Sequence, residues 1–171
     1  MPQYWQQPCS RRRGITPQEG FTLVELIVTI AVMAIIAMMA APSMSNLLES
    51  KRLDTNQRDL ISTLSEAKSQ AVLGRQNVSV NLNSAASNTA TSLNWQASFN
   101  IQLKKLKNAN DPTILLDTTT LIFNANGIVS NITQDVLISI CNKKINTQKN
   151  FILTKLGTLV FKAEETPCSL N

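Results

Sequence analysis

The sequence predicts an α+β protein in which one long helix near the amino terminus packs on an antiparallel β-sheet. Three observations support this fold class. An apolar run occupies residues 21–41, apolar residues then recur at helical spacing up to residue 73, and beyond residue 74 their period changes to two. With 171 residues, 43% hydrophobic and 16% charged, the chain can form one domain plus an apolar segment outside its core.

The composition excludes most classes of enzyme. The chain contains no histidine, so Ser-His-Asp catalysis, Cys-His catalysis and histidine-ligated metal sites are ruled out. Asp111, Asp117 and Asp135 fall near expected loops or strand ends and are candidates for paired carboxylates. No nucleophile, metal-binding cluster or phosphate-binding loop accompanies them, so we interpret them as turn and surface residues. We therefore expect no catalytic activity, no cofactor and no metal site.

The first expected element is a membrane-spanning helix at residues 21–41. This run, FTLVELIVTIAVMAIIAMMAA, contains a single charged residue, Glu25. At about 1.5 Å per residue, a helix of this length spans roughly the 30 Å hydrocarbon core of a bilayer. Three arginines at residues 11–13 place the amino terminus in the cytoplasm, so the residues after 41 lie across the membrane, which in a bacterium is the periplasm. A cleaved secretory signal peptide is the alternative, since it also has a basic start and an apolar run.

The carboxylate of Glu25 requires a partner. A charged side chain inside the membrane costs about 2.5 to 3.5 kcal/mol on insertion scales, so it is normally retained for an interaction. A cut after Gly20 would give Phe21 a new amino group, one helical turn from Glu25 on the same face. The two opposite charges could then neutralise each other, within one chain or between neighbouring chains.

The segment Gly20-Phe21-Thr22-Leu23-Val24-Glu25 resembles the processing site of type IV pilins and type II secretion pseudopilins. This resemblance implies that residues 1–20 are a cytoplasmic leader, that prepilin peptidase cuts between Gly20 and Phe21, and that it methylates the new amino group. It also implies that Glu25 pairs with the amino terminus of an adjoining subunit during filament assembly. The implied partners are other minor and major pilins or pseudopilins, prepilin peptidase and the inner-membrane assembly platform.

The helix is expected to continue as an amphipathic half over residues 42–74, after a kink at Pro42. Proline removes one helical hydrogen bond and can bend the helix axis. The apolar residues that define one face of this half are Leu53, Leu60, Leu64, Ala67 and Ala71. Gly74 supplies a left-handed stop.

Residues 75–171 are expected to form the antiparallel β-sheet domain. Alternating apolar residues predict strands at 78–82, 93–103, 113–116, 121–123 and 128–132, a central strand at 136–141, and a hairpin at 151–162 that turns at Leu156-Gly157. Polar loops are expected at 83–92, 104–112 and 142–150.

Two late cysteines, Cys141 at a strand end and Cys168 in the carboxyl-terminal tail, could meet across the sheet. In an oxidising periplasm a disulfide between them would hold the tail and stabilise the domain by roughly 2 to 4 kcal/mol. Two buried free thiols are the alternative.

Residues 53–80, with the segment Ala67-Lys68-Ser69-Gln70-Ala71, resemble the H-type (GspH) minor pseudopilins and the FimT and FimU minor pilins. The resemblance implies a type IV pilin-like fold and a subunit that primes filament assembly at or near the tip. It leaves open whether the filament is a type IV pilus or a type II secretion pseudopilus.

Some FimT proteins bind DNA through a Gly-Arg-x-Arg motif during natural transformation, and this gives an alternative function in DNA uptake. The matching segment here is Gly157-Thr158-Leu159-Val160, which lacks both arginines that would contact phosphate. Several loop lysines could still form a basic surface if the loops converge, among them Lys143, Lys144, Lys155 and Lys162. We interpret them as scattered solvated lysines, with DNA binding as the minority hypothesis.

Overall fold

In the computed structural model of the chain, the described residues are 21–162 and 165–168, without the side chains of residues 39–43. The chain divides into two units, Met1–Ala41 and Pro42–Asn171. The expected leader, residues 1–20, lies outside the described residues.

One helix, α1, extends over 52 residues, Leu23–Gly74, as the predicted long helix requires. Among the residues that the structure describes, no helix is both long enough and apolar enough to cross a bilayer. The expected membrane segment includes residues 39–41, whose side chains lie outside the description, and it stays a prediction. The side chain of Pro42 is also outside the description, so the kink at this residue is untested.

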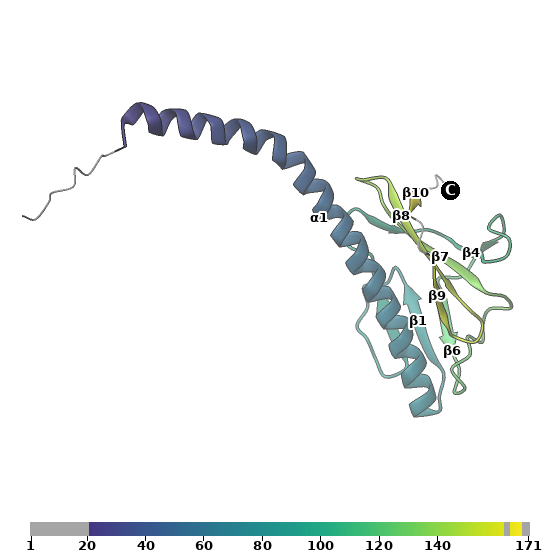
Figure 1. The fold of residues 1–171 in the computed structure, drawn as a ribbon. Helices are drawn as coiled ribbons and strands as arrows, with labels where there is room; N and C mark the ends of the chain where they lie inside the picture. The colour runs from purple at the N-terminus through teal and green to yellow at the C-terminus, as the bar shows by residue number, and fades with distance from the viewer. Residues whose placement is uncertain (1–20, 163–164, 169–171) are drawn as a thin grey trace, which may run out of the picture. The chain divides into compact units, whose positions relative to one another are not determined.

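The amphipathic half of α1 buries the face that its apolar spacing predicts. Leu53, Leu60, Leu64, Ala67 and Ala71 are each at most 1% exposed. Figure 1 shows this half of the helix beside strand β1 (Val78–Leu82). The apolar face therefore packs on the sheet domain.

The helix ends as predicted at Gly74, but the left-handed residue is Arg75, at a φ of 49°. The N–H of Gln76 donates to the carbonyl of Ala71 at 3.2 Å, the longer bond of a Schellman cap. The prediction assigned the left-handed conformation to Gly74 and was wrong by one position, because Gly74 is the last helical residue.

The first sheet has the strand order β2-β1-β6, with β2 at Ser92–Trp95 and β6 at Thr120–Phe123. β1 pairs with β6 antiparallel but with β2 parallel, with Val80 opposite Leu93. The prediction of purely antiparallel pairing is therefore wrong at β2. The segment after β1 returns to the start of that strand, where Ser79 N–H donates to the Thr91 carbonyl at 2.9 Å, so β2 begins beside the beginning of β1.

The second sheet is antiparallel throughout and has the order β10-β8-β7-β4-β5, with β3 on β7 and β9 on β8. Its strands are β3 (Ile101–Leu103), β4 (Leu106–Asn108), β5 (Leu115–Leu116), β7 (Val136–Asn142), β8 (Thr147–Leu153), β9 (Leu159–Phe161) and β10 (Thr166–Pro167). The predicted central strand is β7, and the predicted hairpin is β8–β9, which pairs Leu153 with Leu159.

Two strand predictions and two loop predictions differ from the structure. The alternating segment 93–103 is interrupted between β2 and β3, where Asn100 has a φ of 69°. The predicted strand at 128–132 forms only an isolated bridge between Phe123 and Val129. The expected loop at 104–112 contains β4, and the expected loop at 142–150 is mostly β7 and β8.

Buried residues from α1 and from strands of both sheets form one core in the second unit, and the largest fully buried side chains include Phe123 and Phe151. This core fixes α1 against the sheets and positions the polar contacts described next.

Candidate functional site

The amino-terminal segment begins α1 with a capping arrangement. Thr22 directly precedes the first helical residue, and its Oγ1 accepts a hydrogen bond from the backbone N–H of Glu25 at 3.2 Å. Thr22 is thus the N-cap and Glu25 the third helical residue, the sequence pattern of a capping box. A carboxylate in the first turn also interacts favourably with the helix dipole. Sequence reasoning paired Glu25 with the amino terminus of its own or a neighbouring chain and missed this local role.

The processing residues are only partly visible. Gly20 lies outside the described residues, and Phe21 is 81% exposed. Glu25 is exposed. The cut site and the filament role of Glu25 therefore remain predictions.

A second carboxylate of α1, Glu49, lies at the junction of the helix and the second sheet and is only 3% exposed. Asn142 Nδ2, at the end of β7, donates to Glu49 Oε2 at 2.9 Å and to the Glu49 backbone carbonyl at 3.1 Å. Arg52 lies 3.1 Å and Lys144 3.7 Å from Glu49 Oε1. Asn100 Nδ2 donates to the same oxygen at 3.4 Å.

These contacts stabilise the charged form of Glu49. The hydrogen bond from Asn142 lowers its pKa below the ordinary value of 4.5, burial opposes this, and the positive charges of Arg52 and Lys144 lower it further. Asn142 is fully buried, so its amide bonds mainly serve to hold the helix on the hairpin of β7 and β8. We call Glu49 and Asn142 the helix–sheet junction.

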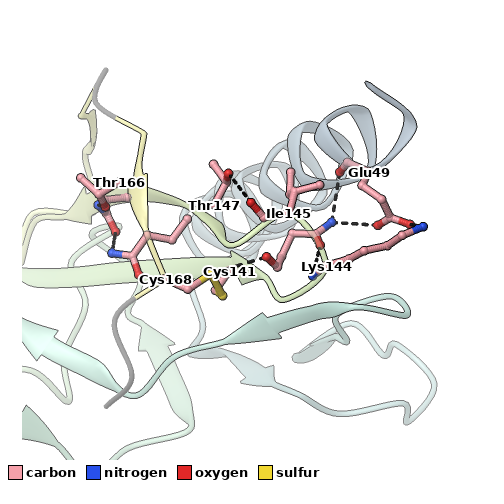
Figure 2. Close-up of a disulfide and its surroundings, with 10 residues drawn as sticks. Glu49, Cys141, Lys144, Ile145, Thr147, Thr166 and Cys168 are labelled. Atoms are coloured by element: carbon pink, nitrogen blue, oxygen red, sulfur yellow. Dashed lines mark hydrogen bonds and ion pairs between the residues drawn. A yellow bond between two sulfur atoms is a disulfide. The ribbon is translucent and has the colours of Figure 1, made fainter. Parts of the chain in front are cut away.

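A disulfide between Cys141 and Cys168 lies beside this junction, with the two Cα atoms 5.7 Å apart (Figure 2). Cys168 Sγ lies 3.5 Å from the carbonyl oxygen of Asn142, and Cys168 N–H donates to the Asn146 carbonyl at 3.3 Å. The residue that anchors Glu49 therefore also contacts the bridge that holds the carboxyl-terminal tail.

Lys149 on β8 links the carboxyl-terminal tail to α1 through two ion pairs. Its ammonium group forms ion pairs with Asp54 of α1 and, at 2.9 Å, with Glu165. Desolvation lowers the pKa of Lys149, but the hydrogen bonds that its ammonium group donates to Asp54 and Glu165 outweigh this effect, and the pKa is raised.

The segment that matches the DNA-binding motif has a structural role at Gly157. This residue has a φ of +70°, and a Cβ added to it would lie 2.3 Å from the carbonyl oxygen of Gly127. Lys68 Nζ, on α1, donates to the carbonyls of Leu156 and Gly157 at 3.2 and 2.9 Å. The turn between β8 and β9 therefore packs against both α1 and the turn at Gly127.

The four candidate DNA-contacting lysines lie at different places along β8 and β9. Lys143 and Lys144 precede β8, Lys155 follows it, and Lys162 follows β9. Lys144 is engaged with Glu49, and its Nζ donates to Ser45 Oγ at 2.9 Å. DNA binding stays the minority hypothesis.

Two of the aspartates singled out as candidate carboxylates make turn contacts. Asp111 accepts hydrogen bonds from the N–H and hydroxyl of Thr113 at 3.1 and 2.6 Å, and these bonds lower its pKa. Asp135 accepts from the N–H of Lys155 at 2.9 Å. Both residues order loops in the structure.

Comparison with known proteins gives one match to the amino-terminal segment and one to the fold. The family model for the prokaryotic N-terminal methylation motif matches residues 15–41. No curated protein sequence matches the chain. The crystal structure of the type IV minor pilin FimU from Pseudomonas aeruginosa strain PAO1 matches with a TM-score of 0.51 and 18% sequence identity, covering 72% of this chain and 99% of that chain.

The motif implies a membrane-anchored pilin precursor, and the structural likeness shows the fold. The chain therefore carries a prokaryotic N-terminal methylation motif at its amino end, and over most of its length its fold is similar to that of the type IV minor pilin FimU.

Proposed function

We propose that the chain is a minor pilin or pseudopilin subunit that assembles through its amino-terminal helix into a type IV pilus or a type II secretion pseudopilus. The observation that carries this proposal is the methylation motif at residues 15–41, which includes the first part of the helix that begins at Leu23. Subunits with this arrangement serve as structural components, so the chain acts by binding other subunits and not by catalysis.

The surface of the first part of α1 supports this role. Large apolar side chains on every side of the helix between Phe21 and Met38 are each at least half exposed. A helix that is apolar all round is stable only when lipid or protein covers it. Lipid covers this helix in the precursor, and neighbouring helices cover it in the filament.

The motif and the apolar helix surface together suggest an order of maturation and assembly. Residues 1–20 are the cytoplasmic leader, residues 21–41 cross the inner membrane, and residues 42–171 are exported to the periplasm. Prepilin peptidase cuts between Gly20 and Phe21 and methylates Phe21. The assembly platform then extracts the subunit, Glu25 docks on the amino group of a neighbour, and the chain primes assembly at or near the filament tip.

The cut is tested by measuring the intact mass of the chain purified from cells that contain the complete assembly machinery. We expect a chain that begins at N-methylphenylalanine, the mass of the precursor from Phe21 onward plus one methyl group. Gly20→Val should leave the precursor uncut, whereas the control Gly14→Val, a second glycine of the same leader, should mature normally. A Gly20→Val chain that matures normally would refute the proposed site.

The filament role is tested separately by isolating filaments and detecting the chain in them. Its presence in substoichiometric amounts supports a minor subunit, and loss of filaments when the chain is deleted supports priming. Correct maturation without any filament association would refute the assembly role and leave the processing step intact.

A further inference from the structure

β9 is an edge strand of the second sheet, and one edge of its backbone faces away from its partner β8. Thr154 N–H donates to the Thr158 carbonyl at 2.9 Å and Lys162 N–H to the Asn150 carbonyl at 3.3 Å, so the hydrogen-bonded positions are 158, 160 and 162. In an antiparallel pair the alternate residues direct their N–H and C=O groups away from the partner. Leu159 and Phe161 therefore point these groups outward, and within the described residues β9 pairs with β8 alone.

In the first sheet, side chains from neighbouring loops cover the two edge strands, β2 and β6. Asn88 Oδ1 accepts from the N–H of Asn94 on β2 at 2.8 Å. On β6, the Asn131 side chain accepts from Ile122 N–H at 2.9 Å and donates to the Thr120 carbonyl at 2.6 Å. Side chains thus occupy the backbone groups that could bind another strand, which is a usual protection of sheet edges.

The β9 edge has the side chains of a binding strand. Leu156, Val160 and Phe161 are 68%, 46% and 61% exposed. Lys155 and Lys162 are exposed on either side of this apolar group, and residues 151–162 contain no acidic residue. An extended segment that adds to this edge would gain main-chain hydrogen bonds and apolar contacts, and carboxylates near its two ends would complement the two lysines.

Glu165, the described acidic residue that follows Lys162 in the sequence, pairs with Lys149 at 2.9 Å. Its carboxylate is engaged within the chain, so a partner segment with acidic ends would complement Lys155 and Lys162.

We propose that β9 is a docking strand that receives an extended, acidic segment of a different pilin-like subunit as an additional β-strand. This inference rests on the proposed function, since it assigns the edge a partner from the same filament. The backbone of Leu159 and Phe161 supplies affinity, while Lys155 and Lys162 select the charge of the incoming segment.

The test uses the mature full-length chain in detergent micelles and a fluorescent, acetylated peptide, Glu-Glu-Val-Thr-Val-Thr-Val-Glu-Glu. We expect saturable binding by fluorescence anisotropy that weakens as salt rises. The double variant Lys155→Glu with Lys162→Glu should weaken binding by about tenfold, as expected for the reversal of two exposed charge pairs. The matched control, Lys105→Glu with Lys143→Glu, has the same net charge and alters exposed lysines away from β9, so it should bind like the wild type.

Two further probes separate strand addition from simple charge attraction. The same peptide with N-methyl groups on its valine and threonine amides cannot donate hydrogen bonds from either edge and should not bind. Phe161→Pro removes an outward N–H without removing a bond to β8, and it should lose peptide binding while retaining the thermal unfolding midpoint of the wild type. If that variant is unstable, the charge reversal and the methylated peptide still decide the question.

Several results would overturn the inference. These are no binding, equal binding of a peptide with lysines at its ends, equal binding of the N-methylated peptide, or equal effects of the two double variants. Tight binding of duplex DNA that is lost in Lys155→Glu with Lys162→Glu, without peptide binding, would instead identify the edge as a nucleic-acid surface. A dimer that forms through β9 in sedimentation would show that a second copy is the occupant.

This experiment separates the inference from the proposed function. A chain that enters filaments but shows none of the peptide effects removes the docking strand alone. A chain that binds the peptide but never enters a filament removes the filament role.

Discussion

Two glutamates of the same helix illustrate two different uses of a carboxylate. Glu25 is exposed at the first turn of α1, where its backbone N–H bonds to Thr22, and Glu49 is buried where α1 meets the second sheet. Glu49 receives its hydrogen bonds and positive charges from Asn142, Arg52 and Lys144 within its own chain. The comparison teaches that Glu49 is a folding residue whose partners lie within its own chain, whereas the docking role of Glu25, whose carboxylate is exposed, stays a prediction.

The largest expected effect separates the two glutamates by function. Glu25→Ala should mature normally but enter filaments at least about tenfold less than the wild type, the loss expected when a charge pair worth about 1.4 kcal/mol or more in a low-dielectric setting is removed. The unfolding midpoint of the sheet domain should not change. Quantitative immunoblotting of purified filaments gives the incorporation, with Glu66→Ala as the control for an exposed carboxylate of the same helix. Unimpaired incorporation of Glu25→Ala would remove it from the docking role.

The next effect concerns the disulfide beside Glu49. Replacing Cys141 and Cys168 together by serine opens a loop with a sequence separation of 27 residues and should cost about 2 to 4 kcal/mol of unfolding free energy. Denaturant unfolding of the wild type with and without reductant provides the same comparison without a mutation. If the double variant is as stable as the oxidised wild type, the tail does not need the bridge, and Lys149 with its two acidic partners is sufficient to hold it.

A third prediction removes the amide that binds Glu49. Asn142→Ala leaves a buried carboxylate without its closest donor and should cost about 1 to 3 kcal/mol, the penalty for an unsatisfied buried polar group. Denaturant unfolding measures the cost. Asn126→Ala, at an exposed turn residue, is the control and should be nearly neutral. Equal stability of both variants would mean that the junction does not hold the helix.

The contrast between the glutamates also shows what sequence reasoning could reach. The buried face of α1 was predictable because Leu53, Leu60, Leu64, Ala67 and Ala71 recur at helical spacing. Glu49, one turn before Leu53, and Asn56, between Leu53 and Leu60, lie on the same face at 3% and 6% exposure. Both are polar, and a polar residue at a buried position looks like a break in the pattern until its partner is known. Asn142, the partner of Glu49, and Ser98, the partner of Asn56, are both remote in sequence, so spacing alone could not identify these contacts.

The strands were predictable where apolar residues dominate and unpredictable where lysines interrupt them. β7 matches its predicted segment because VLISIC is a nearly unbroken apolar run, and the β8–β9 hairpin turns where predicted. The first part of β8 was missed because residues 147–150 are polar. β4 was missed because Leu106 stands between Lys105 and Lys107, although it is only 2% exposed. The parallel pair of β1 and β2 depends on the path of a polar loop, which no periodicity encodes.

A pH titration tests whether Glu49 is stabilised in its charged form. Because the pKa of Glu49 is lowered on folding, its contribution to stability is present above the ordinary value of 4.5 and is lost as the pH falls through the lower folded value. Glu49→Gln should therefore be less stable than the wild type at neutral pH, with a difference that shrinks below pH 4.5. A difference that stays constant with pH would show that the charge of Glu49 contributes nothing.

The smallest expected effect concerns the hydrogen bond between the Glu25 N–H and Thr22, which caps the first turn of α1. Thr22→Ala removes the acceptor for the N–H of Glu25 and should destabilise the first turn by about 1 kcal/mol, which raises amide exchange there roughly fivefold. Hydrogen exchange of the mature chain in micelles measures this change. Thr29→Ala is the matched control, since the Thr29 hydroxyl donates to the Leu26 carbonyl and frees no N–H when removed. Thr22→Ser keeps the acceptor and should restore the protection. If Thr22→Ala loses protection yet enters filaments normally, the cap and the docking of Glu25 are independent. If protection and filament entry fall together and Thr22→Ser restores both, the cap holds Glu25 in place to meet the amino group of its neighbour.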